Sequence, residues 1–308
     1  MLSRRSLLSN LLFLGAGIGA VWLLRERVLW SEPQPSFATG GSTGWLPFAS
    51  RRAALPTVAV DLEGQRINAL IDSGAQYSAI DRAFAARLGL KETFAPLVAV
   101  GISGRPQMGR GVSADVVVGN LALNGLKAAV LDLGPIAGPE GLSAPLILGQ
   151  DMLGQLVADI DFPRRRVMLA APDAHTLPGD ARAIPAQSQG RALTVQVAVG
   201  DTPLEAVVDT GASVVLAVTQ EVAQRLGLLT GQAPRMMSSI VLGGAVSSQV
   251  VRAPKVTFAG ITSQDAEVMI FGGTRPPGFP TGLLGSGALE RFRTILNYSE
   301  GAMHMAYG

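Results

Sequence analysis

The sequence predicts an almost entirely β protein made of two similar lobes, each with one short helix. Three observations predict this fold class. A segment of the chain recurs 137 residues later with the same apolar pattern, the repeated segments alternate apolar and polar residues as half-buried strands do, and 37 glycines with 19 prolines indicate many tight turns. With 48% apolar and 16% charged residues among 308, the chain can form a packed core.

The N-terminal segment stands apart from the rest of the chain. Residues 6–24 carry no charge and have arginines on both sides, and a helix of that length would cross a bilayer. We therefore expect residues 1–28 to form a transmembrane signal anchor or an export signal, followed by a linker over residues 29–51. Residues 3–8 also resemble the twin-arginine export motif.

The charges around the apolar run predict the orientation of the chain. Positive charge is greater before the run than after it, so the positive-inside rule keeps the start in the cytoplasm. The expected location is therefore an inner-membrane anchor facing the periplasm, or export to the periplasm.

The repeat begins with a hairpin that ends in an acidic residue. In the first copy, TVAVDL at residues 57–62 precedes INALIDSGA at residues 67–75; in the second, TVQVAV at residues 194–199 precedes LEAVVDTGA at residues 204–212. The second strand of each hairpin is the more continuously apolar one, which is typical of a buried strand. Each hairpin therefore brings one aspartate to the end of a buried strand.

A short amphipathic helix follows each hairpin. Asp81 and Thr219 are placed to cap the N-termini of these helices, and Gly89 and Gly227 are placed to end them. Glycine-rich turns, further strands and a closing Leu-Gly unit complete each copy.

The composition between the copies marks the domain boundaries. Residues 172–190 are rich in Ala, Pro, Gly and Gln without an apolar period, and we interpret them as a linker. We thus expect a first lobe over residues 52–171 and a second over residues 191–308.

The paired Asp-Ser-Gly-Ala and Asp-Thr-Gly-Ala segments indicate acid–base chemistry. If the halves pack about a pseudo-twofold axis, Asp72 and Asp209 meet at it. Two carboxylates within about 3 Å share one proton, because both cannot ionise comfortably. The ionised member can then take a proton from water while the protonated member polarises a carbonyl. The alternative, that each Asp only caps a turn, explains the duplication less well.

Other classes of chemistry have little support in the sequence. There is no cysteine and there are two histidines, so we expect no metal and no cofactor. The net charge of +2 includes six arginines within the first 52 residues, and we expect no nucleic-acid partner. A serine triad would need His175 from the linker or His304 near the C-terminus, and no Gly-x-Ser-x-Gly occurs.

On these motifs the chain resembles the clan of aspartic proteases that contains the retroviral proteases and pepsin, and it looks most like bacterial retropepsin-like proteins with two fused units. The resemblance covers residues 52–307. It rests on the two Asp-Ser/Thr-Gly-Ala segments and on the Ile-Leu-Gly and Leu-Leu-Gly segments at residues 147–149 and 283–285. It implies an all-β fold of two retropepsin-like β-barrel lobes related by a pseudo-twofold axis, together with the N-terminal transmembrane or signal helix.

The resemblance also implies roles for individual residues. Asp72 and Asp209 would form the catalytic dyad. The residues that would support it are Ser73, Gly74, Thr210 and Gly211. The substrate-covering flaps would contain Gly101, Ile102, Ser103, Gly104, Leu242, Gly243 and Gly244, without the aromatic residue of pepsin-like flaps. Asp151 in the first closing unit faces Gly287 in the second, which suggests an interface or surface residue.

The expected function is that of an aspartic endopeptidase that hydrolyses peptide bonds of a periplasmic or membrane-protein substrate. Its partners would be a polypeptide substrate and, through the N-terminal helix, the membrane. Two alternatives remain: a non-catalytic periplasmic peptide-binding protein of the same fold, and an enzyme whose site forms only between two chains. The linker favours a monomer with an intramolecular dyad, because such a tether gives an effective concentration of roughly millimolar.

Overall fold

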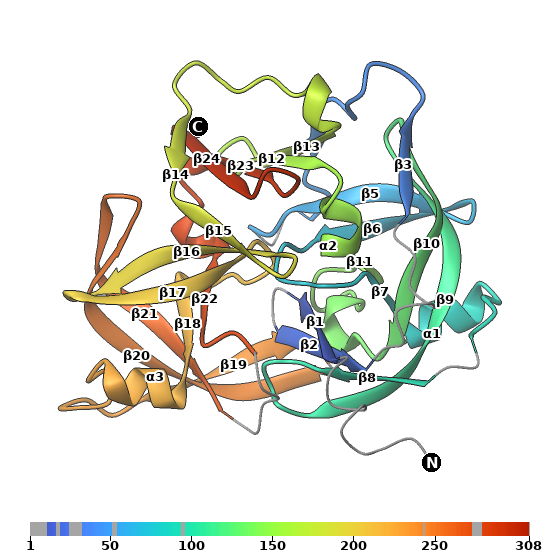
Figure 1. The fold of residues 1–308 in the computed structure, drawn as a ribbon. Helices are drawn as coiled ribbons and strands as arrows, with labels where there is room; N and C mark the ends of the chain where they lie inside the picture. The colour runs from blue at the N-terminus through green and yellow to red at the C-terminus, as the bar shows by residue number, and fades with distance from the viewer. Residues whose placement is uncertain are drawn as a thin grey trace, which may run out of the picture.

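The computed structural model describes the chain almost continuously from residue 33 onward. Backbone and side chains are described for residues 33–50, 54–93, 96–242, 244–272 and 279–307, with Ile240 described by its backbone alone, and the backbone is also described for residues 11–16 and 19–24. Figure 1 shows two β lobes side by side, with a further sheet on one side of both. Strands dominate and the helices are short, which confirms the predicted fold class.

Six strands of the first half close into a barrel. They pair in the cyclic order β10-β7-β11-β6-β5-β9, with β9 pairing again with β10. The strand that leads to the first aspartate, β6, runs parallel to β11 and antiparallel to β5. The elements of this lobe are β3 (Gln34–Phe37), β5 (Thr57–Leu62), β6 (Gln65–Ile71), β7 (Ala79–Asp81), α1 (Arg82–Arg87), β8 (Pro96–Val100), β9 (Pro106–Val118), β10 (Leu121–Leu131), η1 (Gly134–Ile136), β11 (Leu146–Leu148) and α2 (Gln150–Leu153).

The second half builds a barrel of the same design. Its cyclic order, β21-β18-β22-β17-β16-β20, matches the first barrel strand for strand. The duplication in the sequence is therefore a duplication of the fold. The elements of this lobe are β15 (Ala186–Gln189), β16 (Ala192–Val199), β17 (Thr202–Asp209), β18 (Leu216–Thr219), α3 (Gln220–Arg225), β19 (Arg235–Val241), β20 (Gly244–Phe258), β21 (Ile261–Phe271), β22 (Gly282–Gly285) and η3 (Ser286–Ala288).

A third sheet joins the two lobes. Its order is β14-β24-β23-β12-β13-β4, and the central antiparallel pair brings together β12 of the first half and β23 of the second. In Figure 1 this sheet lies opposite the hairpins that begin with β8 and β19. Its elements, with the adjoining turn, are β4 (Leu46–Pro47), β12 (Val157–Asp161), β13 (Arg166–Ala170), η2 (Pro172–Ala174), β14 (Arg182–Ile184), β23 (Phe292–Asn297) and β24 (Ala302–Tyr307).

Local sequence explains why these elements form where they do. On β5, Val58, Val60 and Leu62 alternate with more exposed residues and belong to the main core cluster, which extends through both barrels and the third sheet. Asp81 accepts a hydrogen bond from Phe84 N and Thr219 accepts one from Val222 N, which confirms both predicted helix caps. The first lobe adds the four-residue helix α2, which the sequence did not predict.

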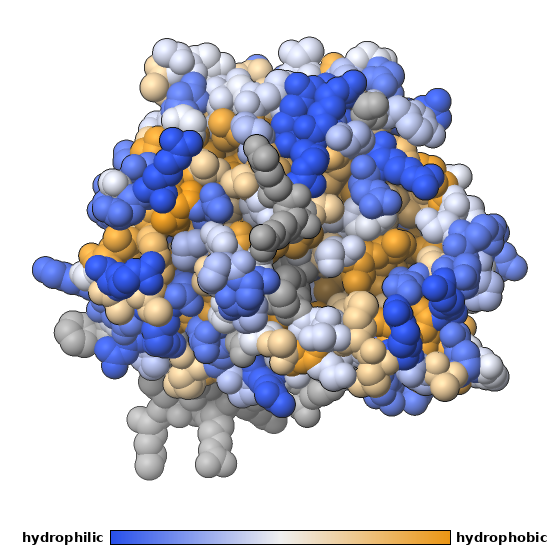
Figure 2. Space-filling model, turned by 180° about the vertical axis from the view of Figure 1, so that it is seen from behind, coloured by the Kyte–Doolittle hydropathy of each residue, from blue (hydrophilic) through white to orange (hydrophobic). Residues whose placement is uncertain are grey.

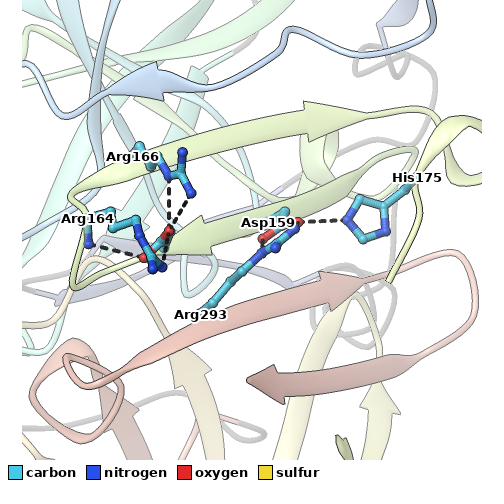
Figure 3. Close-up of polar contacts among 6 residues, drawn as sticks. Asp159, Arg164, Arg166, His175 and Arg293 are labelled. Atoms are coloured by element: carbon cyan, nitrogen blue, oxygen red, sulfur yellow. Dashed lines mark hydrogen bonds and ion pairs between the residues drawn. The ribbon is translucent and has the colours of Figure 1, made fainter. Parts of the chain in front are cut away.

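A buried charged cluster fastens the third sheet to the segment between the lobes (Figure 3). Asp159 on β12 accepts two hydrogen bonds from Arg293 on β23, at 2.8 and 2.6 Å, and its Oδ2 lies 2.7 Å from His175 Nε2. The side chain of Asp159 is fully buried. Burial alone raises the pKa of this carboxyl, but the hydrogen bonds from Arg293 and His175 hold it below its ordinary value.

The prediction of an N-terminal helix is wrong for residues 11–16 and 19–24, which the structure describes as strands. Leu11–Ala16 (β1) and Gly19–Leu24 (β2) form an antiparallel hairpin beside β8, and the other residues of the 1–28 segment lie outside the described ones. Glycines at positions 15, 17 and 19 disfavour a helix by about 1 kcal/mol each relative to alanine. Within the described residues, no helix has the length and hydrophobicity needed to span a bilayer.

The two segments predicted as linkers also contain ordered elements. Between residues 29 and 51, β3 pairs with β10 and β4 pairs with β13. Between residues 172 and 190, β14 pairs with β24 and β15 pairs with β16. These strands lie at sheet edges, where a partner strand supplies hydrogen bonds without requiring an apolar sequence pattern.

Among the described residues, few large apolar side chains are exposed. On the back of the molecule, Figure 2 shows apolar patches on both sides, between more polar regions. Of the large apolar side chains that the structure describes, Met108 on β9 and Met236 on β19 are among the most exposed, at 64 and 57%.

Candidate active site

The two aspartates of the repeat lie at matching positions in the two barrels. Asp72 follows β6 directly, and its N–H donates to Leu148 O at the end of β11. Asp209 is the last residue of β17, opposite Gly285 of the parallel strand β22. Their exposed fractions are 0 and 1%, so both carboxyl groups are buried.

Each carboxyl group is held by the backbone that follows it. Asp72 Oδ1 accepts hydrogen bonds from Gly74 N at 2.9 Å and Ala75 N at 3.1 Å. Asp209 Oδ1 accepts equivalent bonds from Gly211 N and Ala212 N, both at 3.1 Å. One oxygen of each carboxyl group is thus fixed in the same way in both lobes.

The two carboxyl groups meet across the boundary between the lobes. A Cβ atom added to Gly74 would lie 2.5 Å from Asp209 Cγ and 2.7 and 2.8 Å from its two oxygens. Any side chain at position 74 would therefore overlap the opposite carboxyl group. The side chain of Asp72 also acts on the pKa of Asp209, so the two carboxyl groups lie close enough to interact. The structure thus brings together the two aspartates that the sequence singled out.

A reciprocal set of hydrogen bonds joins the residues that follow the aspartates. Ser73 N donates to Thr210 Oγ1 at 3.0 Å, and Thr210 N donates to Ser73 Oγ at 2.8 Å. The hydroxyl groups donate in turn to the opposite strands, Ser73 to Val208 O at 2.7 Å and Thr210 to Ile71 O at 2.9 Å. These four bonds fix the position of one aspartate relative to the other.

Two further side chains support the aspartate loops, and sequence reasoning missed both. Gln150 Nε2 donates to Ser73 O at 2.7 Å, and Ser286 Oγ donates to Thr210 O at 2.5 Å. Each residue directly follows the Leu-Gly unit of its copy, so the two occupy equivalent positions. The alignment of the two copies places these residues opposite each other, but Gln and Ser are chemically unlike, so the alignment did not indicate a shared role.

Asp151 is buried, which corrects the expectation of an interface or surface residue. Its exposed fraction is 1%, and its carboxylate accepts hydrogen bonds from Ser78 N, Ser78 Oγ and Met152 N. It therefore ties α2 to the strand region that follows the first aspartate. Position 287 of the second copy is a glycine and provides no such support.

Burial dominates the electrostatics of the site. It raises the pKa of Asp209 from 3.8 to about 6, although the hydrogen bonds from Asp72, Gly211 N and Ala212 N act in the opposite direction. Up to about pH 6 the pair can therefore hold one proton between its two members. The hydroxyl of Tyr298, buried beside Ser73, has its pKa raised by burial and by the nearby negative charges of Asp72 and Asp209. Tyr298 was not singled out in the sequence for this position.

The predicted flap residues lie at the tips of two hairpins. Gly101, Ile102, Ser103 and Gly104 lie in the turn between β8 and β9, where Gly104 N donates to Gly101 O. Leu242 and Gly244 lie at the turn between β19 and β20, and Gly243 lies outside the described residues. Gly104 and Gly244 have φ of +70 and +131°, a region that favours glycine.

The two histidines lie in the third sheet and in the turn that adjoins it. His175 contacts Asp159 in the cluster of Figure 3, and His304 lies on β24, opposite Ile295 and Ala183.

Comparisons with known proteins give the family. A family model described as aspartyl protease matches residues 58–152 and again residues 195–288. Among solved structures, the chain is similar to a retropepsin-like aspartic protease from Rickettsia conorii, with 23% identity and a TM-score of 0.33 over 41% of this chain and 90% of that one. No curated protein matches it. Because the family model covers both halves and each match contains one of the paired aspartates, the chain belongs to the aspartyl protease family and contains two such units.

Proposed function

We propose that this protein is an aspartic endopeptidase with one active site, built from Asp72 and Asp209 of a single chain. The observation that carries the proposal is the contact between these two buried carboxyl groups across the lobes, with the pKa of Asp209 raised to about 6. A pair of this kind can supply a base and an acid in the same step.

The proposed reaction follows from the charge state of the pair. The ionised carboxylate takes a proton from a water molecule held between the two groups, and the water oxygen attacks the carbonyl carbon of the scissile peptide bond. The protonated carboxyl group donates a hydrogen bond to the carbonyl oxygen as negative charge develops on it. A proton is then delivered to the leaving nitrogen, and the carbon–nitrogen bond breaks.

The neighbouring residues would keep this geometry constant during the reaction. Ser73 and Thr210 bond to each other's backbone, so neither aspartate can shift without breaking hydrogen bonds in the other lobe. The substrate is proposed to be a polypeptide that lies between the aspartates and the two flap hairpins. We further propose that the chain acts in the periplasm, a location supported by the resemblance of residues 3–8 to the twin-arginine export motif.

Single Asp-to-Asn variants test the function directly. Asp72→Asn and Asp209→Asn keep the size of the side chain and its hydrogen-bond acceptor but remove proton exchange, so each should abolish hydrolysis of fluorescein-labelled casein. Asp201→Asn changes an exposed aspartate eight residues from Asp209 and should retain full activity. The dyad mechanism is wrong if either of the first two variants keeps more than a few per cent of the wild-type rate.

A further inference from the structure

Tyr298 places a buried hydroxyl group beside the aspartate pair. It directly follows β23 of the third sheet, and its side chain packs against the main core cluster. The hydroxyl oxygen is buried beside Ser73, where the charges of Asp72 and Asp209 act on it. Among the described residues, this oxygen has no hydrogen-bond partner. A polar group thus lies next to the aspartate loops without a bond that accounts for it.

Ser73 has the capacity to accept the missing bond. A serine hydroxyl can donate one hydrogen bond and accept two. Ser73 Oγ donates to Val208 O and accepts from Thr210 N. Among the described residues, no second donor other than Tyr298 is placed to use its remaining acceptor position. Because an unpaired buried hydroxyl is costly, a small adjustment that turns the Tyr298 O–H towards Ser73 Oγ is favourable.

The repeat replaces this pair of residues with a complementary one. Ser73 and Tyr298 align with Thr210 and Phe162. Thr has one methyl group more than Ser, and Phe has one hydroxyl group less than Tyr, so the two pairs contain the same number of non-hydrogen side-chain atoms. Ser73 and Thr210 are fully buried and Phe162 is 5% exposed, and a packed interior has no room for an extra atom. We expect the twofold relation between the lobes to place Phe162 beside Thr210, with the methyl group filling the space of the hydroxyl.

We infer that Tyr298 is a positioning residue of the aspartate pair, which donates a hydrogen bond from its hydroxyl to Ser73 Oγ and so braces the first aspartate loop from the second half of the chain. In the second loop, the methyl group of Thr210 takes the place of this bond. The inference rests on the proposed function for its consequence alone. Because Ser73 directly follows Asp72, loss of the brace should let Asp72 move and slow the reaction.

Thermal unfolding of Tyr298→Phe tests the bond without any need for activity, since this change removes only the hydroxyl oxygen. If the hydroxyl donates to Ser73, its loss should lower the Tm of the full-length protein by about 2–5 °C, the effect of one buried hydrogen bond. If the hydroxyl is unpaired, its removal should leave the Tm level or raise it, and either result would overturn the inference. Tyr307→Phe, at a tyrosine that is 71% exposed, is the control and should leave the Tm unchanged.

An exchange of residue types between the copies tests the pairing itself. Ser73→Thr adds a methyl group that should overlap the Tyr298 hydroxyl and lower the Tm by more than Tyr298→Phe does. Combining Ser73→Thr with Tyr298→Phe gives the first copy the Thr–Phe pair of the second, and should recover about half or more of that loss, as expected for residues in contact. Losses that simply add in the double variant would contradict the pairing.

The second copy supplies the reciprocal experiment, which also serves if Ser73→Thr does not fold. Phe162→Tyr adds a hydroxyl beside Thr210 and should lower the Tm, and Thr210→Ser should recover about half of that loss in the double variant. Circular dichroism of each variant shows whether it is folded. A loss that Thr210→Ser leaves unchanged or deepens would count against the pairing.

Kinetics then test the consequence for the proposed reaction. Tyr298→Phe should lower kcat for labelled casein about three- to tenfold, the effect of one hydrogen bond, with KM within about twofold. Tyr307→Phe should leave both constants unaltered. A wild-type kcat in Tyr298→Phe would show that Tyr298 only stabilises the fold, and would overturn its positioning role. If the wild-type protein cleaves nothing, the proposed function fails, and thermal unfolding still decides whether Tyr298 and Ser73 are bonded.

Discussion

The raised pKa of Asp209 predicts a specific dependence of stability on pH. The folded-state value of about 6 lies above the ordinary value of 3.8, so the folded protein binds this proton more tightly than the unfolded chain does. The corresponding stabilisation is fully present below pH 3.8 and is lost as the pH rises through about 6. A difference of about two pKa units corresponds to about 3 kcal/mol of unfolding free energy, at about 1.4 kcal/mol per unit.

Asp209→Asn should remove this dependence. The amide oxygen can still accept from Gly211 N and Ala212 N, and the side chain stays neutral at every pH. Relative to wild type, the variant should therefore gain about 2 kcal/mol of unfolding free energy between pH 4 and pH 7.5, because an aspartate with a pKa of 3.8 is already partly ionised in the unfolded chain at pH 4. Contributions from all other titrating groups cancel in this difference, apart from that of Asp72, which is coupled to the replaced group.

Urea denaturation followed by circular dichroism at several pH values measures the effect. Asp201→Asn, at an exposed turn, is the control and should give a curve parallel to that of wild type. The reasoning is refuted if the difference between Asp209→Asn and wild type stays constant within about 0.5 kcal/mol over this pH range, because the buried carboxyl group would then have an ordinary pKa.

Three other expectations concern the contacts around the site and the location of the chain. Thr210→Val leaves Ser73 N and Ile71 O without their partner and should cost about 2–4 kcal/mol in urea denaturation, whereas Thr202→Val at an exposed position should cost little. Arg293→Met should cost about 3–5 kcal/mol near neutral pH. That cost should shrink as the pH falls below 3.8, because a carboxyl group with a lowered pKa stabilises the fold only while ionised; a cost independent of pH would contradict it. Cell fractionation should place the chain with inner membranes or in the periplasm, and recovery in the cytoplasm alone would contradict the proposed location.

Much of the fold could be predicted because its determinants are local or repeated. Alternation of Val58, Val60 and Leu62 identifies a half-buried strand, and the caps at Asp81 and Thr219 identify where helices begin. The contact between the aspartates was expected from the repeat, since two copies of one fold that pack about an axis bring equivalent residues together.

The remaining features depend on contacts that leave no local pattern. Gln150 and Ser286 both donate to backbone carbonyl groups, and unlike side chains can perform that task, so their equivalence is invisible in a comparison of residue types. His175 lies in a segment without apolar period, and only the fold brings it to Asp159. Ile102 and Leu242 likewise belong to apolar clusters formed by the opposite half of the chain, and only the packed pair of lobes brings them there.

Fusion of the two copies in one chain allows the two halves of the site to differ. In a symmetric dimer each supporting residue would occur twice, whereas here Asp151 braces only the first aspartate loop and a glycine occupies the matching position 287. Tyr298, whose buried hydroxyl lies beside Ser73, aligns in the repeat with Phe162, which has no hydroxyl. Such differences give the two carboxyl groups unequal surroundings, and unequal surroundings favour one position of the shared proton over the other. A single chain can therefore assign the base and the acid to fixed partners, which two identical subunits cannot do before substrate binds.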